Sequence, residues 1–231
     1  YFPSDFNFLK VIFILVTFLG IASDKNFLPS PKKRILIQIF LLIFLVYLGN
    51  LKIYDLRLNF LNTLLENDFF NLVFTVFCLA ILINGSNFLD GLNGLLVGYF
   101  SLVIISILYL SYNNDFVFIN YNDFLKIFLF SVILFYFFNI INLVYLGDSG
   151  SYLIAILIGV LLIQVYSNNE YLSPYYVACL LWYPAFENLF SLLRRLYKKI
   201  DVSRPDNFHL HQLLFFFLKN KSSLVYDKIN S

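Results

Sequence analysis

The sequence predicts an all-α fold, a polytopic integral membrane helix bundle with about seven transmembrane helices. Composition is the first reason: of 231 residues, 60% are hydrophobic and 13% are charged, and the mean hydropathy is +0.78. A soluble domain carries about 25% charged residues, so this chain could not solvate its own surface in water. The second reason is a series of long apolar runs, and the third is that the polar residues gather between these runs.

Seven apolar runs are candidates for crossing a bilayer, which takes roughly 17–25 residues. They cover residues 6–22, 34–49, 69–84, 92–112, 124–144, 152–167 and 172–193. Helices are expected because irregular backbone cannot face lipid, and the alternation typical of a membrane β-barrel is absent. The connections are short, so we expect residues 1–231 to form a single membrane-embedded domain, with a polar, amphipathic segment at 50–68. The chain begins at Tyr1 and contains no methionine, which favours a fragment of a longer fold or a processed chain.

Lysine and arginine are concentrated in alternate connections, which indicates the orientation of the chain. One set of connections consists of residues 23–33, 84–94, 145–151 and the tail, whose first part is 194–221. With Arg34 at a boundary, this set holds 12 of the 16 basic residues, and the other set holds 4. The positive-inside rule places the more basic set in the cytoplasm, where the tail would lie along anionic headgroups.

Four polar clusters stand out, and all four fall in the connections expected to be cytoplasmic. They are Ser23-Asp24-Lys25, the segment 84–94 (NGSNFLDGLNG), the segment 147–151 (GDSGS) and the segment 204–211 (RPDNFHLH). Polar residues at or near membrane depth are costly and usually functional.

The segment 84–94 carries Asn84, Asn87 and two turn pairs, Asp90-Gly91 and Asn93-Gly94. Such pairs mark turns; they would break the helix and free backbone N–H groups. An anion such as a phosphate can bind those groups at the following helix start. A polar loop that merely caps two helices explains the same residues, so this cluster alone leaves both interpretations open.

The third cluster places Asp148 between Gly147 and Gly150, and these small neighbours would let a bulky ligand approach the backbone. Mg²⁺ takes one or two carboxylates and completes its shell with phosphate oxygens and water. Asp24, Asp90 and Asp148 could converge to bind it, and Mn²⁺ could take its place. An isolated Gly-Asp-Ser is, however, more often a helix N-cap.

The fourth cluster holds the two histidines of the chain, His209 and His211. Their spacing places them on different sides of a helix but on the same side of an extended strand. No cysteine or helical histidine pair completes a zinc site. With Arg204 nearby, diphosphate binding or proton transfer is the favoured role, and a basic loop in contact with headgroups is the alternative.

Together the clusters resemble the polyprenyl-phosphate N-acetylhexosamine-1-phosphate transferases (glycosyltransferase family 4), which include undecaprenyl-phosphate GlcNAc-1-phosphate transferases and phospho-MurNAc-pentapeptide transferases. This family shows, in order, an Asp-Asp pair after a helix, Asn-x-x-Asn-x-x-Asp-Gly-x-x-Gly-Leu, Gly-Asp-x-Gly-Ser, and Pro-Asp-Arg-x-His-x-His-His. Residues 84–95 match the second motif and residues 147–151 match the third in full. Glu187 and the Arg194-Arg195 pair fit the stretch before the histidines, with Glu for the more usual Asp. The resemblance covers nearly all of the chain.

The resemblance implies a Mg²⁺-dependent phosphotransferase that moves a sugar-1-phosphate from a UDP-sugar, such as UDP-N-acetylglucosamine, to undecaprenyl or another polyprenyl phosphate. UMP is released, in the first lipid-linked step of a cell-envelope glycan such as lipopolysaccharide. Asp148 would bind the metal; Asp24, Asp90, His209 and His211 would be catalytic; and Asn84, Asn87, Lys32, Arg34 and Arg204 would bind substrate. The implied location is the bacterial inner (plasma) membrane, with the active-site loops in the cytoplasm, a homodimer as one arrangement and no nucleic acid as partner.

The chain departs from the family pattern at several positions. Ser23 replaces the first Asp of the pair, Arg34 stands for a lysine, Asn207 for an arginine and Gln212 for the last histidine. Arginine and lysine are not interchangeable at a phosphate. Ser23 and Gln212 raise the alternative of a catalytically impaired member. A polytopic transporter is the other, although a transporter places its ionisable residues near mid-bilayer in paired repeats. Here they lie at helix ends on one side, and no repeat is evident.

Overall fold

The computed structural model describes residues 7–113, 122–169, 172–199 and 208–221. Within these ranges every regular element is a helix, which confirms the all-α prediction. The helices are α1 Asn7–Asp24, α2 Pro31–Leu48, α3 Asn59–Leu65, α4 Asp68–Leu89, α5 Leu95–Asn113, α6 Asn122–Ile140, α7 Gly147–Ser167, α8 Pro174–Tyr197 and α9 Leu210–Lys221.

All seven apolar runs form helices. Five of the described helices, α4 to α8, are long and apolar enough to cross a membrane. The other two, α1 and α2, have 18 residues each and pack against each other and against α7 and α4. α2 starts with Lys32, Lys33 and Arg34, which reduces its apolar length. The chain is therefore a multi-pass membrane protein built as a helix bundle.

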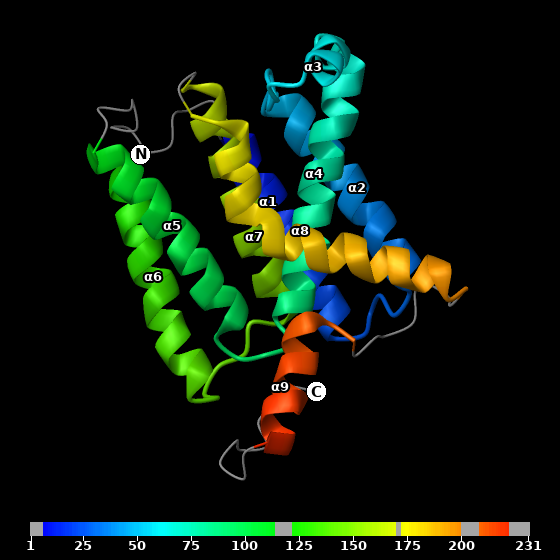
Figure 1. Ribbon diagram of the computed structural model, residues 1–231, viewed down its shortest axis with the longest axis vertical. Helices are drawn as coiled ribbons and strands as arrows, with labels where there is room; N and C mark the ends of the chain where they lie inside the picture. Colours follow the sequence, from blue (N-terminus) through cyan, green and yellow to red (C-terminus); the bar gives the residue numbers. More distant parts are fainter. Residues whose placement is uncertain (1–6, 114–121, 170–171, 200–207, 222–231) are drawn as a thin grey trace.

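The helix α7 lies at the centre of the bundle (Figure 1). It packs against α1 and α4, and its residues Ala155, Ile156 and Ile158 are completely buried. α2 packs on both α1 and α4, while α5 and α6 form a pair that stands beside the other helices. A helix that is apolar on all sides suits this central position. The packing around α7 also fixes the direction of its N-terminus.

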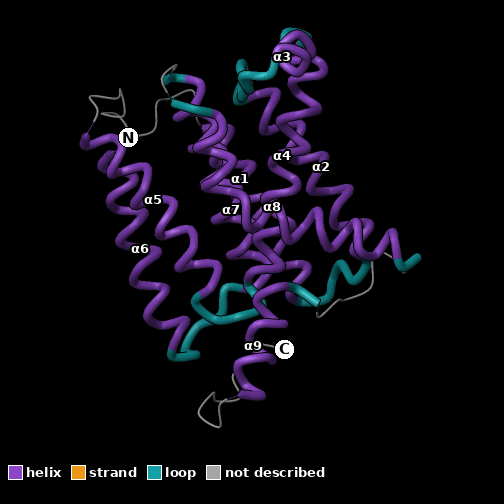
Figure 2. Tube along the Cα trace, viewed as in Figure 1, coloured by secondary structure: helices purple, strands orange, loops and turns teal. Residues whose placement is uncertain are grey.

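The connections α1–α2, α4–α5 and α6–α7 all lie at one end of the bundle, the lower end in Figure 2. We call this the motif end. α9 projects below it, whereas α3 lies at the opposite end. The first three polar clusters thus meet at one end, and the described part of the fourth, residues 208–211, joins them there.

Two segments that the sequence predicts to be loops are largely helical. α4 continues through Asn84 and Asn87 to Leu89, so the predicted loop 84–94 is reduced to the turn after Leu89. α7 already begins at Gly147, inside the predicted loop 145–151. Packing explains both corrections, because Ser86 is completely buried within α4 and the start of α7 is capped from another helix.

Other boundaries also differ from the prediction. α6 ends at Ile140 rather than at residue 144, because Asn142 takes a φ of 59°, a left-handed conformation that terminates helices. The tail 194–221, predicted as a cytoplasmic loop, contains the end of α8 and all of α9. Segment 50–68 contains the short helix α3.

The helix α8 bends near its middle, where Pro184 lies, and its second half runs sideways across the bundle (Figure 1). Proline removes one helical hydrogen bond and clashes with the preceding turn, which kinks a helix. α4 touches α8 at this place, since a Cβ on Gly85 would lie 2.0 Å from the carbonyl oxygen of Pro184. A small residue that permits such close approach is typical of helix packing in membranes.

We expect Gly85→Ala to destabilise the protein by about 1–3 kcal/mol, because the added methyl group meets α8 backbone that cannot rotate away. Gly98→Ala is the matched control: a Cβ there would meet only the ring of Tyr136, at 3.0 Å, and alanine favours a helix by about 1 kcal/mol. Thermal unfolding in detergent, followed by circular dichroism, measures both variants. A Gly85→Ala protein at least as stable as the wild type would contradict the close contact.

Candidate active site

The N-terminus of α7 is capped by a side chain from α1. Asp24, the last residue of α1, accepts hydrogen bonds from the backbone N–H groups of Asp148 (2.9 Å) and Ser149 (3.2 Å). Gly147 has a φ of +66°, and a Cβ there would lie 2.9 Å from Oδ2 of Asp24. A carboxylate at this place satisfies free N–H groups and the positive end of the helix dipole. Asp24 therefore performs the capping that an isolated Gly-Asp-Ser suggests for Asp148.

The Asp148 carboxylate does not cap α7, and its Oδ2 atom accepts hydrogen bonds from three donors. Nη1 of Arg34 lies at 2.8 Å, the Tyr152 hydroxyl lies at 3.3 Å, and the Ser23 hydroxyl donates to the same oxygen. Arg34 also donates to the Ser23 hydroxyl. The side chains of Arg34 and Asp148 are 26% and 20% exposed, so a ligand from the aqueous side can reach this ion pair.

Asp90 completes a group of three carboxylates. It follows directly on α4. Burial, with smaller contributions from the charges of Asp148 and Asp24, raises the pKa of Asp90 from 3.8 to about 7, against a hydrogen bond with the Gly147 backbone that lowers it. The structure thus brings together Asp24, Asp90 and Asp148, which the sequence predicts to converge.

The two asparagines of the second cluster point toward neighbouring helices at the same end. Oδ1 of Asn87 accepts a hydrogen bond from the Ser151 hydroxyl (3.1 Å), which ties α4 to the first turn of α7. Nδ2 of Asn84 donates to Oε1 of Gln38 in α2 (3.2 Å) and to the carbonyl of Ala80 (2.8 Å). Asn84 thus ties α4 to α2, the helix that carries Arg34, and Asn87 ties α4 to α7, the helix that carries Asp148.

A set of amides that the sequence reading missed links the two motif-bearing connections. Oδ1 of Asn139, at the end of α6, accepts from the backbone N–H of Gly94 (2.6 Å), and its Nδ2 donates to the carbonyl of Val144 (2.9 Å). Asn93 bonds Asn142 as well. Asn139 is 1% exposed. Its position inside an apolar run was the available signal, because a buried amide in a membrane helix needs partners.

The histidines lie against α8 and the end of α4. Nδ1 of His209 is 3.0 Å from Oε2 of Glu187, and the His209 ring stacks on Phe88 with centroids 4.6 Å apart. The rings of His209 and His211 are nearly parallel, at 7° and 5.7 Å. They face the same side although α9 begins at Leu210, because His209 precedes the helix.

His211 approaches the Asp90-Gly91 turn. A Cβ on Gly91 would lie 3.2 Å from Nε2 of His211, so a larger residue here would press on the imidazole ring. Burial lowers the pKa of His211 from 6.5 to about 4, with the charge of Glu187 opposing the shift; the ring is therefore neutral at pH 7. Nε2 of His211 and Oε1 of Gln212 are buried with no hydrogen-bond partner among the described residues.

Of the predicted substrate-binding residues, Lys32 is not joined to this group. Lys32 is exposed in the first turn of α2, two residues before Arg34. Arg204 lies outside the described residues. Arg194, which follows Glu187 by two turns of α8, instead lies over the Phe208 ring at 5.7 Å and donates to the Phe208 carbonyl.

The donor set suits a hard divalent cation bound together with a substrate. Among the described residues, no group of three or more His, Cys, Asp and Glu side chains forms a ready-made metal site. Mg²⁺ does not need one, because it takes one or two carboxylates and fills its shell with phosphate oxygens and water. Burial is the main cause of the raised pKa of Asp90, and the nearby charges of Asp148 and Asp24 add to it.

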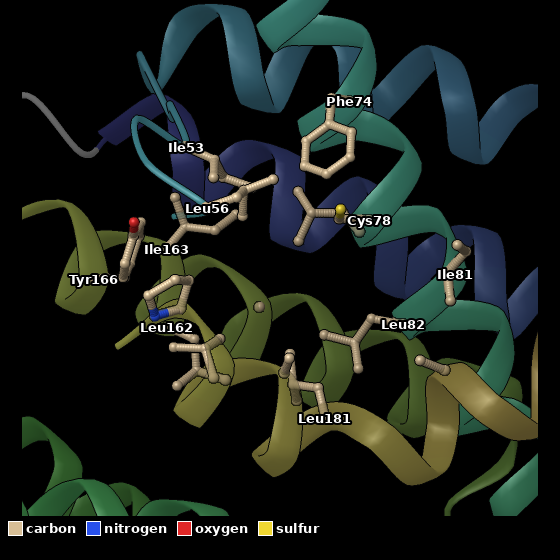
Figure 3. A pocket seen from close by; sticks show the side chains of 16 residues that line it. Ile53, Leu56, Phe74, Cys78, Ile81, Leu82, Leu162, Ile163, Tyr166 and Leu181 are labelled. Atoms are coloured by element: carbon tan, nitrogen blue, oxygen red, sulfur yellow. The ribbon is translucent and has the colours of Figure 1, made fainter. Parts of the chain in front are cut away.

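An apolar pocket of about 330 Å³ lies between α4, α7 and α8. In Figure 3, Phe74 and Cys78 of α4 face Leu162 and Ile163 of α7, and Leu181 of α8 lies at the lower side of the pocket. The pocket also includes Ala185 of α8, next to the bend. On the opposite side from the motif end it is covered by residues of the α2–α3 connection, Ile53 and Leu56.

The pKa of Asp90 gives a pH-dependent contribution to stability. The folded protein keeps a proton on Asp90 over the range from 3.8 to about 7 in which the unfolded chain releases it. Without divalent cations, we expect the stability of the wild type to fall across this range relative to Asp90→Asn, which does not titrate. Unfolding temperatures measured in a series of buffers test this. A difference between the two proteins that is constant with pH would contradict the raised pKa.

Comparison with known proteins agrees with the residues gathered at the motif end. Residues 7–166, which include all three aspartates, match the model of Glycosyl transferase family 4. A probable undecaprenyl-phosphate N-acetylglucosaminyl 1-phosphate transferase from Bacillus subtilis (strain 168) is 30% identical over 215 residues, which are 92% of this chain and 59% of that relative. The chain thus spans less than two thirds of the relative's length. No solved structure is significantly similar. The extent of the family match, over more than half of the chain, establishes that this protein belongs to glycosyl transferase family 4.

Proposed function

We propose that this protein transfers a sugar-1-phosphate from a UDP-sugar, in the first instance UDP-N-acetylglucosamine, to undecaprenyl or another polyprenyl phosphate. An oxygen of the lipid phosphate attacks the phosphorus that carries the sugar. A diphosphate link to the lipid forms, and the bond from that phosphorus to the oxygen of UMP breaks. The products are a polyprenyl diphosphate sugar and UMP. The name of the Bacillus relative supports undecaprenyl phosphate as the acceptor and N-acetylglucosamine 1-phosphate as the transferred group.

The observation that carries the proposal is the convergence of Asp24, Asp90 and Asp148 at the start of α7, beside the guanidinium of Arg34. Phosphoryl transfer is mainly positioning and neutralisation of charge. Carboxylates alone would repel a diphosphate, so a site of this kind suits a phosphate that arrives with a cation. Asp148, supported by the nearby Asp90, would hold Mg²⁺, which when bound supplies charge neutralisation on the diphosphate.

The basic and amide side chains would bind the donor. Arg34 presents a planar guanidinium that matches phosphate oxygens in pairs, and it can move from Asp148 to a phosphate once a metal occupies the carboxylate. Asn84 and Asn87 would orient the nucleotide-sugar, and exposed Lys32 would attract it electrostatically. Arg204 is proposed for the same role from its motif position alone.

The acid–base roles follow from the surroundings of each group. Asp90, with a pKa of about 7, is suited to exchange a proton near neutral pH. Asp24 is occupied as the cap of α7, so its contribution is to hold the Asp148 segment in place. Nε2 of His211, buried and unpartnered among the described residues, is suited to accept or donate a hydrogen bond with the diphosphate.

The apolar pocket would take part of the polyprenyl chain. It lies in the membrane-spanning part of the bundle between α4, α7 and α8 and extends to Ala185 at the bend of α8. A lipid phosphate at the motif end could therefore send its chain along apolar side chains into the membrane. We propose that the motif end faces the cytoplasm of a bacterial plasma membrane, where UDP-sugars are found and where the more basic connections favour it.

We expect Asp148→Asn to lower UMP release by at least about a hundredfold, because the site loses the carboxylate that holds the metal and pairs Arg34. The assay supplies UDP-N-acetylglucosamine, polyprenyl phosphate and Mg²⁺. Asp123→Asn is the control, since Asp123 is exposed in the first turn of α6 at the opposite end, and its activity should equal that of the wild type. Full activity of Asp148→Asn would refute the metal assignment. A wild type that releases no UMP with any of a panel of UDP-sugars would favour a catalytically impaired member.

Ala178 and Cys179 provide a matched pair for the lipid pocket. Both residues are exposed, but Ala178 lines the pocket and its neighbour Cys179 does not. We expect Ala178→Phe to fill the pocket and raise the KM for long-chain polyprenyl phosphate by about tenfold, the effect of losing one or two buried apolar contacts. Cys179→Phe should leave the KM unchanged. Equal KM values for the two variants would show that the lipid chain binds elsewhere.

A further inference from the structure

Glu187 is a buried carboxylate that holds the histidine segment from inside α8. It is 1% exposed, and both of its oxygens are engaged. Oε1 accepts from the backbone N–H of Leu210 (2.8 Å), and Oε2 faces Nδ1 of His209 at 3.0 Å. Nδ1 of His211 lies further away, 3.8 Å from Oε1.

Burial makes these partners obligatory. A carboxylate in a low-dielectric interior costs several kcal/mol unless hydrogen bonds and opposite charge compensate it. The Leu210 N–H is a fixed donor, because α9 begins at this residue. The Tyr183 side chain also hydrogen-bonds Glu187, and Oε2 lies 3.0 Å from Nδ1 of His209. Because a carboxylate accepts but does not donate, the contact with His209 is a hydrogen bond only if Nδ1 carries a hydrogen.

We propose that Glu187 is a positioning residue that fixes His209 as the tautomer protonated on Nδ1, so that Nε2 is the nitrogen left for the substrate. The inference rests on the proposed function for its catalytic meaning, but the tautomer itself is a property of the folded protein. The same logic operates wherever a carboxylate sets the orientation and tautomer of a working imidazole.

The neighbours of His209 support a fixed ring rather than a rotating one. Phe88 covers one face with centroids 4.6 Å apart, and His211 lies parallel at 5.7 Å. Tyr183 approaches Nδ1 of His211 at 3.3 Å, so the second ring is also held on its Nδ1 side by α8. Both rings therefore turn their Nδ1 atoms toward α8 and their Nε2 atoms away from it.

Replacing Glu187 by glutamine is expected to change the tautomer of His209. The amide of Glu187→Gln can still accept from Leu210 through its oxygen, and its NH₂ group then faces Nδ1 of His209. Because an NH₂ group donates, Nδ1 must become an acceptor and the proton must move to Nε2. Glu187→Asp keeps a carboxylate and should keep the Nδ1-protonated form.

The chain contains two histidines, so ¹⁵N-histidine labelling reports on these rings alone. We expect ring-nitrogen NMR shifts at alkaline pH, where both rings are neutral, to show His209 protonated on Nδ1 in the wild type and in Glu187→Asp, and on Nε2 in Glu187→Gln. His211→Gln assigns the two sets of signals. An Nε2-protonated His209 in the wild type would overturn the proposal, and this outcome does not depend on whether Glu187→Gln folds. An unchanged tautomer in folded Glu187→Gln would also overturn it.

Activity provides the second readout. We expect Glu187→Gln to lower kcat by about ten- to hundredfold, as is typical when the partner of a working histidine is removed, with little change in the KM for the UDP-sugar and with partial recovery in Glu187→Asp. Glu66→Gln, at the exposed end of α3, controls for loss of a carboxylate. The tautomer shift with unchanged kcat would overturn the positioning role. A wild type without transferase activity would refute the proposed function and leave the tautomer result standing.

Discussion

The hydrogen bonds from the α7 N-terminus to Asp24 are the interaction on which the motif end depends. They join the first described helix to the central helix, at a point where a Cβ on Gly20 would lie 2.3 Å from Cα of Ser149. Because Asp24 caps α7, the Asp148 side chain does not cap its own helix and instead contacts Arg34 and Ser23. Were Asp24 elsewhere, Asp148 would be the natural cap of its own helix, and the carboxylate group would not exist in this form.

Much of this arrangement could be predicted because it follows from one-dimensional patterns. Apolar length gave the helices, and alternation of basic connections placed the polar clusters at one end. The cap itself could not be predicted, since Asp24 and Asp148 are separated by 124 positions and either could have served. The limits of α4 were misjudged for a related reason: the polar segment that starts at Asn84 was predicted to be a loop, but α4 continues through it and packs against Pro184 at Gly85.

The residues missed by sequence reasoning are those whose partners are distant. Asn139 reads as one polar residue in an apolar run, yet it connects the turn at Gly94 to the carbonyl of Val144. From the sequence, Glu187 was recognised only as part of a motif. In the structure, its carboxylate contacts His209 and the backbone of Leu210 in the histidine segment. In both cases the buried polar group is recognisable from sequence, but its function depends on which helix lies opposite, and that is a property of the bundle.

The bend of α8 has a consequence for how the protein is made. Everything that forms the aspartate group, from α1 to the start of α7, leaves the ribosome before α8 does, so this part can assemble while synthesis continues. The second half of α8 and the histidine segment arrive afterwards and dock on a surface that is already present, with Gly85 receiving Pro184. In the proposed function, the aspartate group would therefore be in place before the histidine segment, and the last contact made, Glu187 with His209, would complete the site.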